Sequence, residues 1–498
     1  MLRRGGRDVQ ETLERGSSVE RNLTAAQTTE VPSLPIVVPV SCFLKVDLAF
    51  EGFAARLRRW RSNLLSLVMM LLRAESASCG HVSQAELDYK SLPLDEEFTS
   101  WLDQQRLCGR QIILLSDAPA ELCDLIAKRL KQSLELAYSP PTSIPLFAFL
   151  RQKFPGGFAY AGRSQADLDT WTACEAAVFC RVRPQLVKTV SDLGKPILAE
   201  FPQLQITPLA WLRMLRLHHW VKNLLLFAPA LFGNVLFESG VFLRCAIGFV
   251  LLGIIASCTY LVNDVLDLDA DRQHRSKAAR PIASGEISLI FGFALPPLGI
   301  SVGLLGAAYI SSQFAAALAG YALLSLSYSF VLKRLAILDA LTVAGLYVLR
   351  LVMGIVLANV AFSPWLLTFA AFFFFSLLLA KRQTEIQGAL DGNYEALKHR
   401  GYKPSDGPLT LALGVASGTA SIIVMNLYLM QEVFGQTLYL HPTRLWAVPV
   451  GLGIWLCHIW LFAHRGELHE DPVQFAFSDP TSLAVGLGVL AVFGLAIL

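Results

Sequence analysis

Apolar and polar residues alternate differently in the two halves of this chain. Up to about residue 200, charged and polar residues interrupt every apolar run, whereas beyond Pro208 long apolar segments follow one another almost to the C-terminus. Nine of these segments are about 17–23 residues long, which is enough for a helix to cross the hydrocarbon core of a bilayer. They lie at 223–242, 245–262, 287–309, 314–332, 338–358, 364–380, 409–430, 444–463 and 482–498. The pattern predicts an all-α polytopic membrane bundle of nine transmembrane helices over residues 209–498.

The first part of the chain has the pattern of a soluble domain. Residues 31–200 alternate short apolar runs with polar helical stretches, which is typical of an α/β fold. Buried strands are predicted at 35–40, 110–115 and 158–161. Residues 1–30 are polar and contain no apolar core, so we expect a disordered tail and no cleavable signal peptide.

Composition agrees with a membrane protein. Hydrophobic residues make up 54% of the chain, charged residues only 16%, and the mean hydropathy is +0.49. The formal net charge of +3 is too small to suggest a nucleic-acid partner. The nine cysteines include no C-x-x-C pair, so we expect reduced and mostly buried thiols.

The loops between the predicted spans differ in charge. The loops near 310–313, 359–363 and 431–443 contain no Lys or Arg. Alternate loops contain the basic residues Arg272, Arg275, Lys277, Arg280, Lys333, Arg334, Lys381, Arg382, Lys398, Arg400, Lys403 and Arg465. Because short cytoplasmic loops are enriched in Lys and Arg, we expect the basic loops and the N-terminal domain to be cytoplasmic.

An acidic segment, Asn263–Asp271, follows the second predicted span. Asp264, Asp267 and Asp271 stand at i, i+3 and i+7, so a helix would place all three on one stripe. Three like charges repel one another unless a cation lies among them. Mg²⁺ prefers a few carboxylates together with water and phosphate oxygens. The spacing therefore predicts a catalytic Mg²⁺ site with these three aspartates as ligands, to which Asn263 adds an amide oxygen.

Basic residues follow directly after the acidic segment. His274, Lys277 and Arg280 precede the sequence Pro281-Ile282-Ala283-Ser284-Gly285. Cations beside a carboxylate–metal cluster suit a diphosphate, whose outer oxygens need their own positive partners. The alternative is a solvated loop with incidental charges, but ionisable residues that cluster at a membrane boundary favour a functional site.

The pattern N-D-x-x-D-x-x-x-D at the end of a span, followed by a basic segment and R-P-I-A-S-G, resembles the first signature of the UbiA prenyltransferase superfamily. The resemblance implies a Mg²⁺-dependent transferase with nine helices around a central cavity. It also implies a cytoplasmic opening for a diphosphate donor and a lateral opening for a lipid. We therefore expect an integral, multi-pass protein of the bacterial inner membrane.

The remaining motifs distinguish between two branches of this superfamily. Aromatic prenyltransferases have a second Asp-rich signature, but the corresponding stretch here offers Tyr328, Lys333 and only one acidic residue, Asp339. The segment Leu215–Asn223 resembles the L-R-P-x-Q-W-x-K-N of decaprenyl-phosphate phosphoribosyltransferases, with His218 in place of Pro. The segments Ala380-Lys381-Arg382-Gln383-Thr384-Glu385, Arg465-Gly466-Glu467, Asp471-Pro472 and Asp479-Pro480 also resemble that branch.

The resemblance implies transfer of 5-phosphoribose from 5-phosphoribosyl diphosphate to a polyprenyl phosphate. The alternative is transfer of a polyprenyl group from its diphosphate to an aromatic or other acceptor. Two phosphorylated substrates need more cationic partners than a single one does. The many basic residues therefore favour phosphoribosyl transfer over prenyl transfer. The expected substrate-binding residues are Lys222, Asn223, His274, Lys277, Arg280, Tyr328, Lys333, Asp339, Arg350, Lys381, Arg382 and Glu385.

Some of these residues have simpler explanations. Lys333, Lys381 and Arg382 could anchor helix ends at the membrane surface, the role that we assign to Arg334. Arg350 lies well inside a predicted span, where an unpaired cation is costly. We therefore expect Arg350 to face the cavity or to pair with a carboxylate, for which Asp339 is one candidate.

The order of segments in the N-terminal domain resembles a haloacid-dehalogenase-type phosphatase domain. That family needs D-x-D-G-T after its first strand, but residues 38–43 contain no aspartate. Ser116 fits the second motif, and the last motif keeps Gly162, Ser164 and Asp167, with Arg163 where an acidic or amide residue is usual. We expect a degenerate fold without phosphatase chemistry. A catalytically silent lipid-binding scaffold and a transporter remain alternatives for the whole protein.

Overall fold

The computed structural model describes residues 34–60, 88–115, 120–129, 135–137, 144–203, 205–274, 276–392, 397, 400–434, 439–468, 475–476 and 478–497. The chain forms two compact units. Unit 1 comprises Met1–Lys45 and Leu94–Gln205, and unit 2 comprises Val46–Pro93 and Ile206–Leu498. The segment Val46–Pro93, which we predicted to belong to the soluble domain, therefore groups with the membrane helices. The predicted tail over 1–30 lies outside the described residues.

Unit 1 is built on a six-stranded sheet in the order β3-β2-β1-β4-β5-β6, in which every pairing is parallel. The strands are β1 (Ile36–Pro39), β2 (Ile112–Leu115), β3 (Glu135–Ala137), β4 (Ala159–Gly162), β5 (Ala176–Val182) and β6 (Ile197–Pro202). The predicted strands correspond to β1, β2 and β4. The strand order reverses between β1 and β4, which is where open α/β sheets bind ligands.

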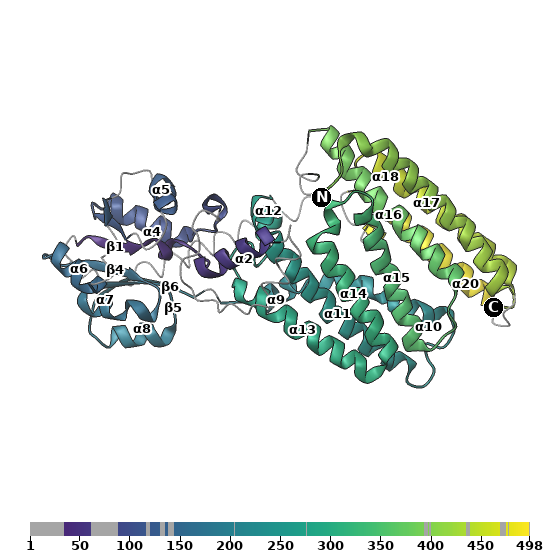
Figure 1. Cartoon of the computed structure of the whole chain (residues 1–498), viewed down its shortest axis with the longest axis horizontal. Helices are drawn as coiled ribbons and strands as arrows, with labels where there is room; N and C mark the ends of the chain where they lie inside the picture. The colour runs from purple at the N-terminus through teal and green to yellow at the C-terminus, as the bar shows by residue number, and fades with distance from the viewer. Residues whose placement is uncertain are drawn as a thin grey trace, which may run out of the picture. The chain divides into compact units, whose positions relative to one another are not determined.

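Helices cover both faces of this sheet, which explains its short continuous apolar runs. Helices α4 (Glu96–Leu107) and α5 (Ala120–Arg129) lie on one side, and α7 (Leu168–Ala173) and α8 (Pro184–Ser191) on the other (Figure 1). The core on the second side also includes α6 (Leu146–Lys153), and its buried residues include Val37, Ile113, Leu150, Tyr160, Trp171, Phe179 and Val190.

Unit 2 is helical. Its α-helices are α2 (Leu48–Trp60), α9 (Pro208–Met214), α10 (Ala228–Phe232), α11 (Val241–Leu266), α12 (Leu268–Gln273), α13 (Leu289–Ile310), α14 (Ser312–Phe330), α15 (Leu338–Ala358), α16 (Pro364–Leu390), α17 (Gly407–Tyr428), α18 (Ala447–His464) and α20 (Pro480–Ile497). Three 3₁₀ segments, η5 (Leu217–Phe227), η6 (Lys277–Ala279) and η7 (Leu332–Arg334), contribute to the site described below.

Within the described part of the chain, six helical segments are long and apolar enough to cross a membrane, so nine spans are not confirmed. These segments are Val241–Leu266, Leu289–Ile310, Leu338–Ala358, Pro364–Leu390, Pro404–Val433 and Pro442–His464. The predicted span 223–242 is instead the end of η5 followed by the short α10, which stops at Gly233 before Asn234 adopts a left-handed conformation. Polar residues such as Gln313 lower the hydropathy of α14, and the apolar α20 is shorter.

Helix α15 lies between two apolar cores because two of its faces are apolar. Its residues Ala340, Ala344, Tyr347, Leu351 and Ile355 pack with α16 and α18. A second set, Leu346, Met353, Leu357 and Ala358, packs with η5, α10, α11 and α14. A helix that is apolar on most of its circumference is buried. Gly354 permits close approach to η5, since an added Cβ would lie 2.2 Å from the carbonyl oxygen of Leu226.

Candidate functional site

The acidic segment is divided between two helices. Helix α11 ends at Leu266, Asp267 has φ −101° and ψ 10°, and α12 begins at Leu268. The backbone bonds from Asp267 to Asn263 (2.9 Å) and from Asp271 to Asp267 (2.8 Å) continue across the junction. The predicted single helical stripe is therefore interrupted at Asp267, although the i, i+4 connections remain.

Two arginines neutralise the first and last aspartates. Arg216 and Arg280 both donate to the buried Asp264 carboxylate, the latter through Nη1 at 3.1 Å. The same Nη1 of Arg280 also donates to Asp271. Burial raises the pKa of Asp271 above its ordinary value, although Arg280 and Lys277 oppose the effect. A negative Asp271 therefore depends on nearby positive charge.

Lys333 neutralises the middle of the segment. Its ammonium lies 2.6 and 2.7 Å from the two oxygens of Asp267 and 2.9 Å from the amide oxygen of Asn263. Burial lowers the pKa of Lys333, Asp267 opposes that effect, and Arg400 adds to the lowering. Lys333 is thus part of the acidic cluster and more than a helix-end anchor.

The donor set suits a hydrated cation. Among the described residues, no three His, Cys, Asp or Glu side chains converge closely enough to hold a metal by themselves. Two cationic nitrogens instead bridge pairs of ligands: one joins Asp264 to Asp271, and the other joins Asn263 to Asp267. Mg²⁺ in proteins uses one or two carboxylates and completes its shell with water and phosphate. Such pairs fit that requirement.

Arg350 lies in the interior of the bundle. Only 4% exposed, it donates to Asn223 Oδ1 (3.0 Å) and to the Tyr321 hydroxyl (2.8 Å), and it stacks on the rings of Tyr321 and Tyr347. Lys222 also lies over the Tyr347 ring, at 5.8 Å. Within the described residues Arg350 forms no ion pair, and the pairing with Asp339 that we considered does not form.

Asp339 belongs to a separate buried network. It is fully buried and accepts from Arg382 Nε (2.6 Å) and the Tyr402 hydroxyl (2.6 Å). Arg382 also binds both oxygens of Glu385, at 2.7 and 2.8 Å, and Arg400 contacts both acids at 3.4 Å. The Arg382 guanidinium therefore binds two carboxylates and joins α16 to the start of α15, while Arg400 and Tyr402 join the loop before α17 to the same Asp339.

The other predicted residues lie around these groups. Lys381 lies within α16 and Tyr328 lies near the end of α14, and both are half-buried. His274 follows α12, and its Nδ1 lies 3.2 Å from the Ser276 hydroxyl. Lys277 lies in η6. Of the more distant segments, Asp479 caps α20 through Ser482, whereas Asp471 lies outside the described residues.

Three site residues were missing from the prediction: Arg216, Arg400 and Tyr402. Arg216 stands within the L-R-x-x-x-W-x-K-N segment, so that segment contained a signal for it. Tyr402 and Arg400 belong to a loop far from Asp339 in sequence, and no local pattern connects them. Only the tertiary structure brings these residues to the acids that they contact.

The switch point of the unit 1 sheet contains Arg163, at the position where we noted that haloacid-dehalogenase-type domains usually have an acidic or amide residue. Arg163 Nη1 donates to the carbonyls of Ser41 (3.1 Å) and Leu44 (2.9 Å), just beyond β1. Asp167 accepts from the backbone amides of Arg163 and Ser164 and from the Tyr160 hydroxyl. Both side chains therefore maintain the loops. Ser116 lies outside the described residues.

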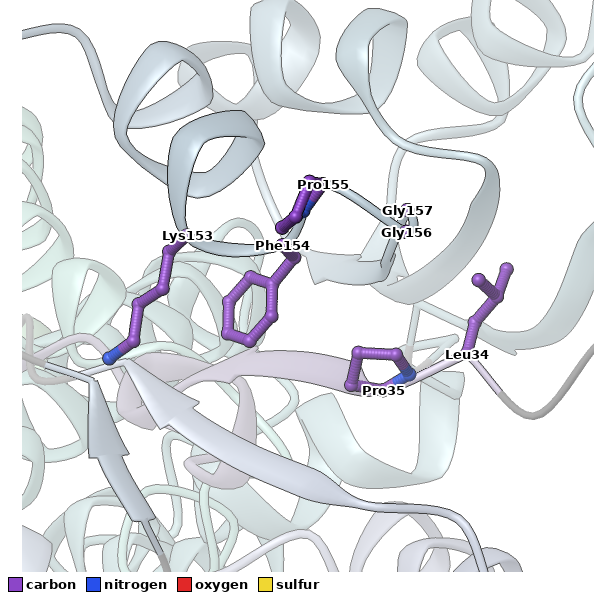
Figure 2. Close-up of a pocket in the computed structure, with 7 residues that line it drawn as sticks. All are labelled: Leu34, Pro35, Lys153, Phe154, Pro155, Gly156 and Gly157. Carbon is purple, nitrogen blue, oxygen red and sulfur yellow. The ribbon is translucent and has the colours of Figure 1, made fainter.

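A hollow of about 350 Å³ occurs in unit 1 (Figure 2). It is lined by Leu34, Pro35, Lys153, Phe154, Pro155, Gly156 and Gly157. Leu34 and Pro35 precede β1, so the hollow lies at the amino end of that strand, away from the switch point. Lys153 is its one charged lining residue, which provides no arrangement for catalysis.

A model of the UbiA prenyltransferase family matches residues 225–478, about half of the chain. The chain belongs to the UbiA prenyltransferase family. Together with its apolar helices, this makes it an integral multi-pass membrane protein of a transferase family.

This UbiA-family protein is similar in sequence to proteins of three kinds. It is 38% identical over 412 residues to the uncharacterized protein y4nM of Sinorhizobium fredii, covering 82% of this chain and 80% of that one. It is 30% identical over 280 residues to the nodulation protein NoeC of Azorhizobium caulinodans, covering 55% and 89%. It is 35% identical over 179 residues to a decaprenyl-phosphate phosphoribosyltransferase of Corynebacterium glutamicum, covering 35% of this chain and 54% of that enzyme.

Among solved structures, a UbiA homolog from Archaeoglobus fulgidus bound to DMAPP and Mg²⁺ matches with 18% identity and a TM-score of 0.45. The match covers 58% of this chain and all of that one.

Proposed function

We propose that this UbiA-family protein transfers 5-phosphoribose from 5-phosphoribosyl diphosphate to a polyprenyl phosphate, at the cytoplasmic side of a bacterial inner membrane. The observation that carries the proposal is the cluster of three aspartates whose carboxylates accept hydrogen bonds from Arg216, Arg280 and Lys333. Such a cluster can exchange its internal ion pairs for a cation and a diphosphate. The similarity to decaprenyl-phosphate phosphoribosyltransferases supports this choice of donor.

The acidic residues and their cationic partners would have different roles. Asn263, Asp264, Asp267 and Asp271 would hold Mg²⁺, which neutralises negative charge on the leaving diphosphate when it is bound. Arg216, Arg280 and Lys333, supported by His274 and Lys277, would bind the outer oxygens of the same diphosphate. Charge-assisted bonds of this kind are stronger than bonds between neutral groups.

The reaction needs no strong base. A phosphate oxygen of the lipid attacks C1 of the ribose while the bond from C1 to the diphosphate oxygen breaks, and the diphosphate leaves with the bonding electrons. The attacking phosphate is already ionised at neutral pH. The side chains therefore bind and orient the two reactants and stabilise the charge that grows on the leaving group.

The phosphate of the lipid acceptor would be bound near Arg350. The partners of this buried cation within the described residues are neutral oxygens, and the Asn223 amide nitrogen is buried without a hydrogen-bond partner there. An unpaired cation inside a membrane protein and an unsatisfied buried donor are both costly. A lipid phosphate would satisfy both, with Lys222 and Tyr328 as further candidates. Lys381 remains our candidate for the 5-phosphate of the donor.

The experiment is a product analysis with purified full-length protein. It is incubated with Mg²⁺, 5-phosphoribosyl diphosphate and polyprenyl phosphate, and the lipid product is identified by mass spectrometry. A parallel reaction contains prenyl diphosphate and 4-hydroxybenzoate. We expect a phosphoribosylated lipid in the first reaction, abolished in Asp267→Asn. Product in the second reaction alone would replace our proposal with prenyl transfer, and no product in either would favour a lipid-binding scaffold.

We also propose that unit 1 is a degenerate haloacid-dehalogenase-like domain that has lost hydrolysis. The support is the strand order, the absence of aspartate from residues 38–43 and the placement of Arg163 at the switch point.

A further inference from the structure

Helix α2 stands between β1 and β2 in the sequence but packs into unit 2. Its residue Ala54 is buried with Leu261, Val265 and Leu268 of α11 and α12. Phe53 contacts Phe293 of α13 edge to face at 4.9 Å. The N-terminal part of the chain therefore supplies a helix that packs beside the acidic segment.

Two ion pairs join α2 to α12. Glu51 is fully buried, and its carboxylate accepts hydrogen bonds from both terminal nitrogens of Arg272, at 2.5 and 3.0 Å. About two helical turns further along α2, Arg58 Nη2 lies 2.9 Å from Asp269 Oδ2. A bidentate, buried arginine–carboxylate pair fixes orientation as well as distance.

Within α12, the residues that contact α2 lie on either side of Asp271, which belongs to the acidic cluster. Asp269 and Arg272 contact α2, whereas Asp271 between them contacts Arg280. Arg272 Nε also donates to the Ala283 carbonyl at 3.0 Å, within the turn that follows Arg280. The Glu51–Arg272 pair is thus connected to the backbone on both sides of the Asp271–Arg280 contact.

We propose that α2 is a positioning element of the diphosphate site, with Glu51 and Arg58 as positioning residues. Glu51 acts through Arg272, and Arg58 acts through Asp269. Together they set the direction of α12, so that Asp271 and Arg280 face the same ligand. This inference rests on the proposed function of the acidic cluster. It gives the N-terminal part of the chain a role in the membrane enzyme that does not depend on phosphatase chemistry.

The test measures ligand binding by full-length protein in detergent, using isothermal titration with Mg²⁺ and inorganic pyrophosphate together. Glu51→Gln keeps the size of the side chain but removes its charge. We expect its pyrophosphate affinity to fall by about 10- to 100-fold, the range found when supports of metal ligands are removed. Arg58→Ala should weaken binding less, because its pair is partly exposed.

Two comparisons separate positioning from general stability. Arg244→Ala removes an arginine that donates to the Leu357 carbonyl at the opposite end of α11, about 30 Å from Asp264 at 1.5 Å per helical residue. This control should bind pyrophosphate as tightly as wild type does, although its melting temperature should fall by about as much as that of Glu51→Gln. The double variant Glu51→Gln/Arg272→Gln should bind no more weakly than Arg272→Gln alone, because Glu51 acts through Arg272.

Wild-type affinity in both Glu51→Gln and Arg58→Ala would overturn the role of α2 and leave the proposed function intact. An equal loss in Arg244→Ala would also overturn it, since binding would then follow stability. Absence of Mg²⁺-dependent pyrophosphate binding in wild type would overturn the proposed function together with this inference. If Glu51→Gln shows no cooperative melt, the pyrophosphate affinities of Arg58→Ala and Arg244→Ala are compared. A loss in Arg58→Ala alone supports the role of α2, and equal affinities overturn it.

Discussion

Single residues in the acidic cluster are bound by the protein's own cations. Asp264 accepts hydrogen bonds from Arg216 and Arg280, and Asp267 accepts from Lys333. From sequence alone we expected repulsion among the carboxylates, which would make loss of one aspartate neutral or stabilising. The contacts reverse that expectation, because removing a carboxylate leaves a partly buried cation without its partner.

We predict that Asp264→Asn abolishes Mg²⁺-dependent transfer and lowers thermal stability. Arg216 and Arg280 lose a charged acceptor, which costs about 1–3 kcal/mol. Turnover and thermal unfolding in detergent measure the two effects. Full Mg²⁺-dependent turnover in this variant would show that Asp264 is not a metal ligand.

We predict that two neighbouring cations in α16 behave differently. Lys381→Ala should weaken binding of 5-phosphoribosyl diphosphate by roughly 10- to 150-fold, the equivalent of about 1.5–3 kcal/mol for a charge-assisted contact, with the fold intact. Arg382→Ala should instead destabilise the protein by about 3–5 kcal/mol, because Asp339 and Glu385 remain buried without it. Titration calorimetry and thermal melts separate these outcomes. Equal donor binding by Lys381→Ala and wild type would remove Lys381 from the site.

At the scale of elements, the buried network around Asp339 connects the start of α15, the end of α16 and the loop before α17. The Tyr402 hydroxyl donates to Asp339 and accepts from the Ile337 amide at 2.8 Å. Ile337 itself has φ +70°, an unusual conformation for a β-branched residue. The hydrogen bond from its amide helps to hold this turn.

We predict that Tyr402→Phe loses about 1–3 kcal/mol of stability, because Asp339 and the Ile337 amide lose a partner. Burial and the Asp339 charge raise the pKa of Tyr402 above its ordinary value. A raised folded-state pKa makes the stabilisation complete below the unfolded value of about 10, and it is lost as pH rises through the folded value. Melts of both proteins should therefore differ by a constant amount from pH 6 to 9. A difference that disappeared near pH 7 would contradict the assignment.

Two exposed cysteines test which helices face lipid. Cys108 ends α4 in unit 1, and Cys457 lies on α18 in unit 2. We predict that a water-soluble maleimide labels Cys108 much faster than Cys457 in membranes, whereas a lipid-soluble maleimide labels Cys457. The variants Cys108→Ser and Cys457→Ser identify each signal by mass spectrometry. Rapid labelling of Cys457 from water would place α18 outside the bilayer.

At the scale of the whole molecule, the N-terminal chain contributes to both units. Val46–Pro93 groups with the membrane helices, so residues 1–200 do not correspond to one structural unit. A test of phosphatase activity therefore needs the full chain, with the membrane site inactivated.

We predict that full-length Asp264→Asn protein does not hydrolyse p-nitrophenyl phosphate. Residues 38–43, at the end of β1, contain no aspartate, and Asp167 accepts hydrogen bonds from backbone amides and the Tyr160 hydroxyl. The released nitrophenolate is followed by its absorbance. Hydrolysis that disappeared on Asp167→Asn would show that unit 1 retains chemistry.

Features set by neighbouring residues could be predicted from the sequence. Apolar length decides which segments can cross a membrane. The spacing of Asp264, Asp267 and Asp271 places them on successive helical turns, because residues three and four apart are neighbours on a helix. Strands β1, β2 and β4 were also predictable, because each is a short apolar run of neighbouring residues. The span at 223–242 was not, because hydropathy does not register the left-handed conformation of Asn234, which follows the end of α10.

Only the tertiary structure decided which charges meet. Arg350 and Arg382 are both cations in apolar helices, yet one contacts neutral acceptors and the other two carboxylates. The pairing of Glu51 with Arg272 joins residues 221 positions apart, and no local pattern encodes it. Burial makes such pairs selective, because a charge removed from water must find an opposite charge or several hydrogen-bond partners. The sequence thus determined that a charged cluster forms at the end of α11, and packing determined which residues neutralise and orient it.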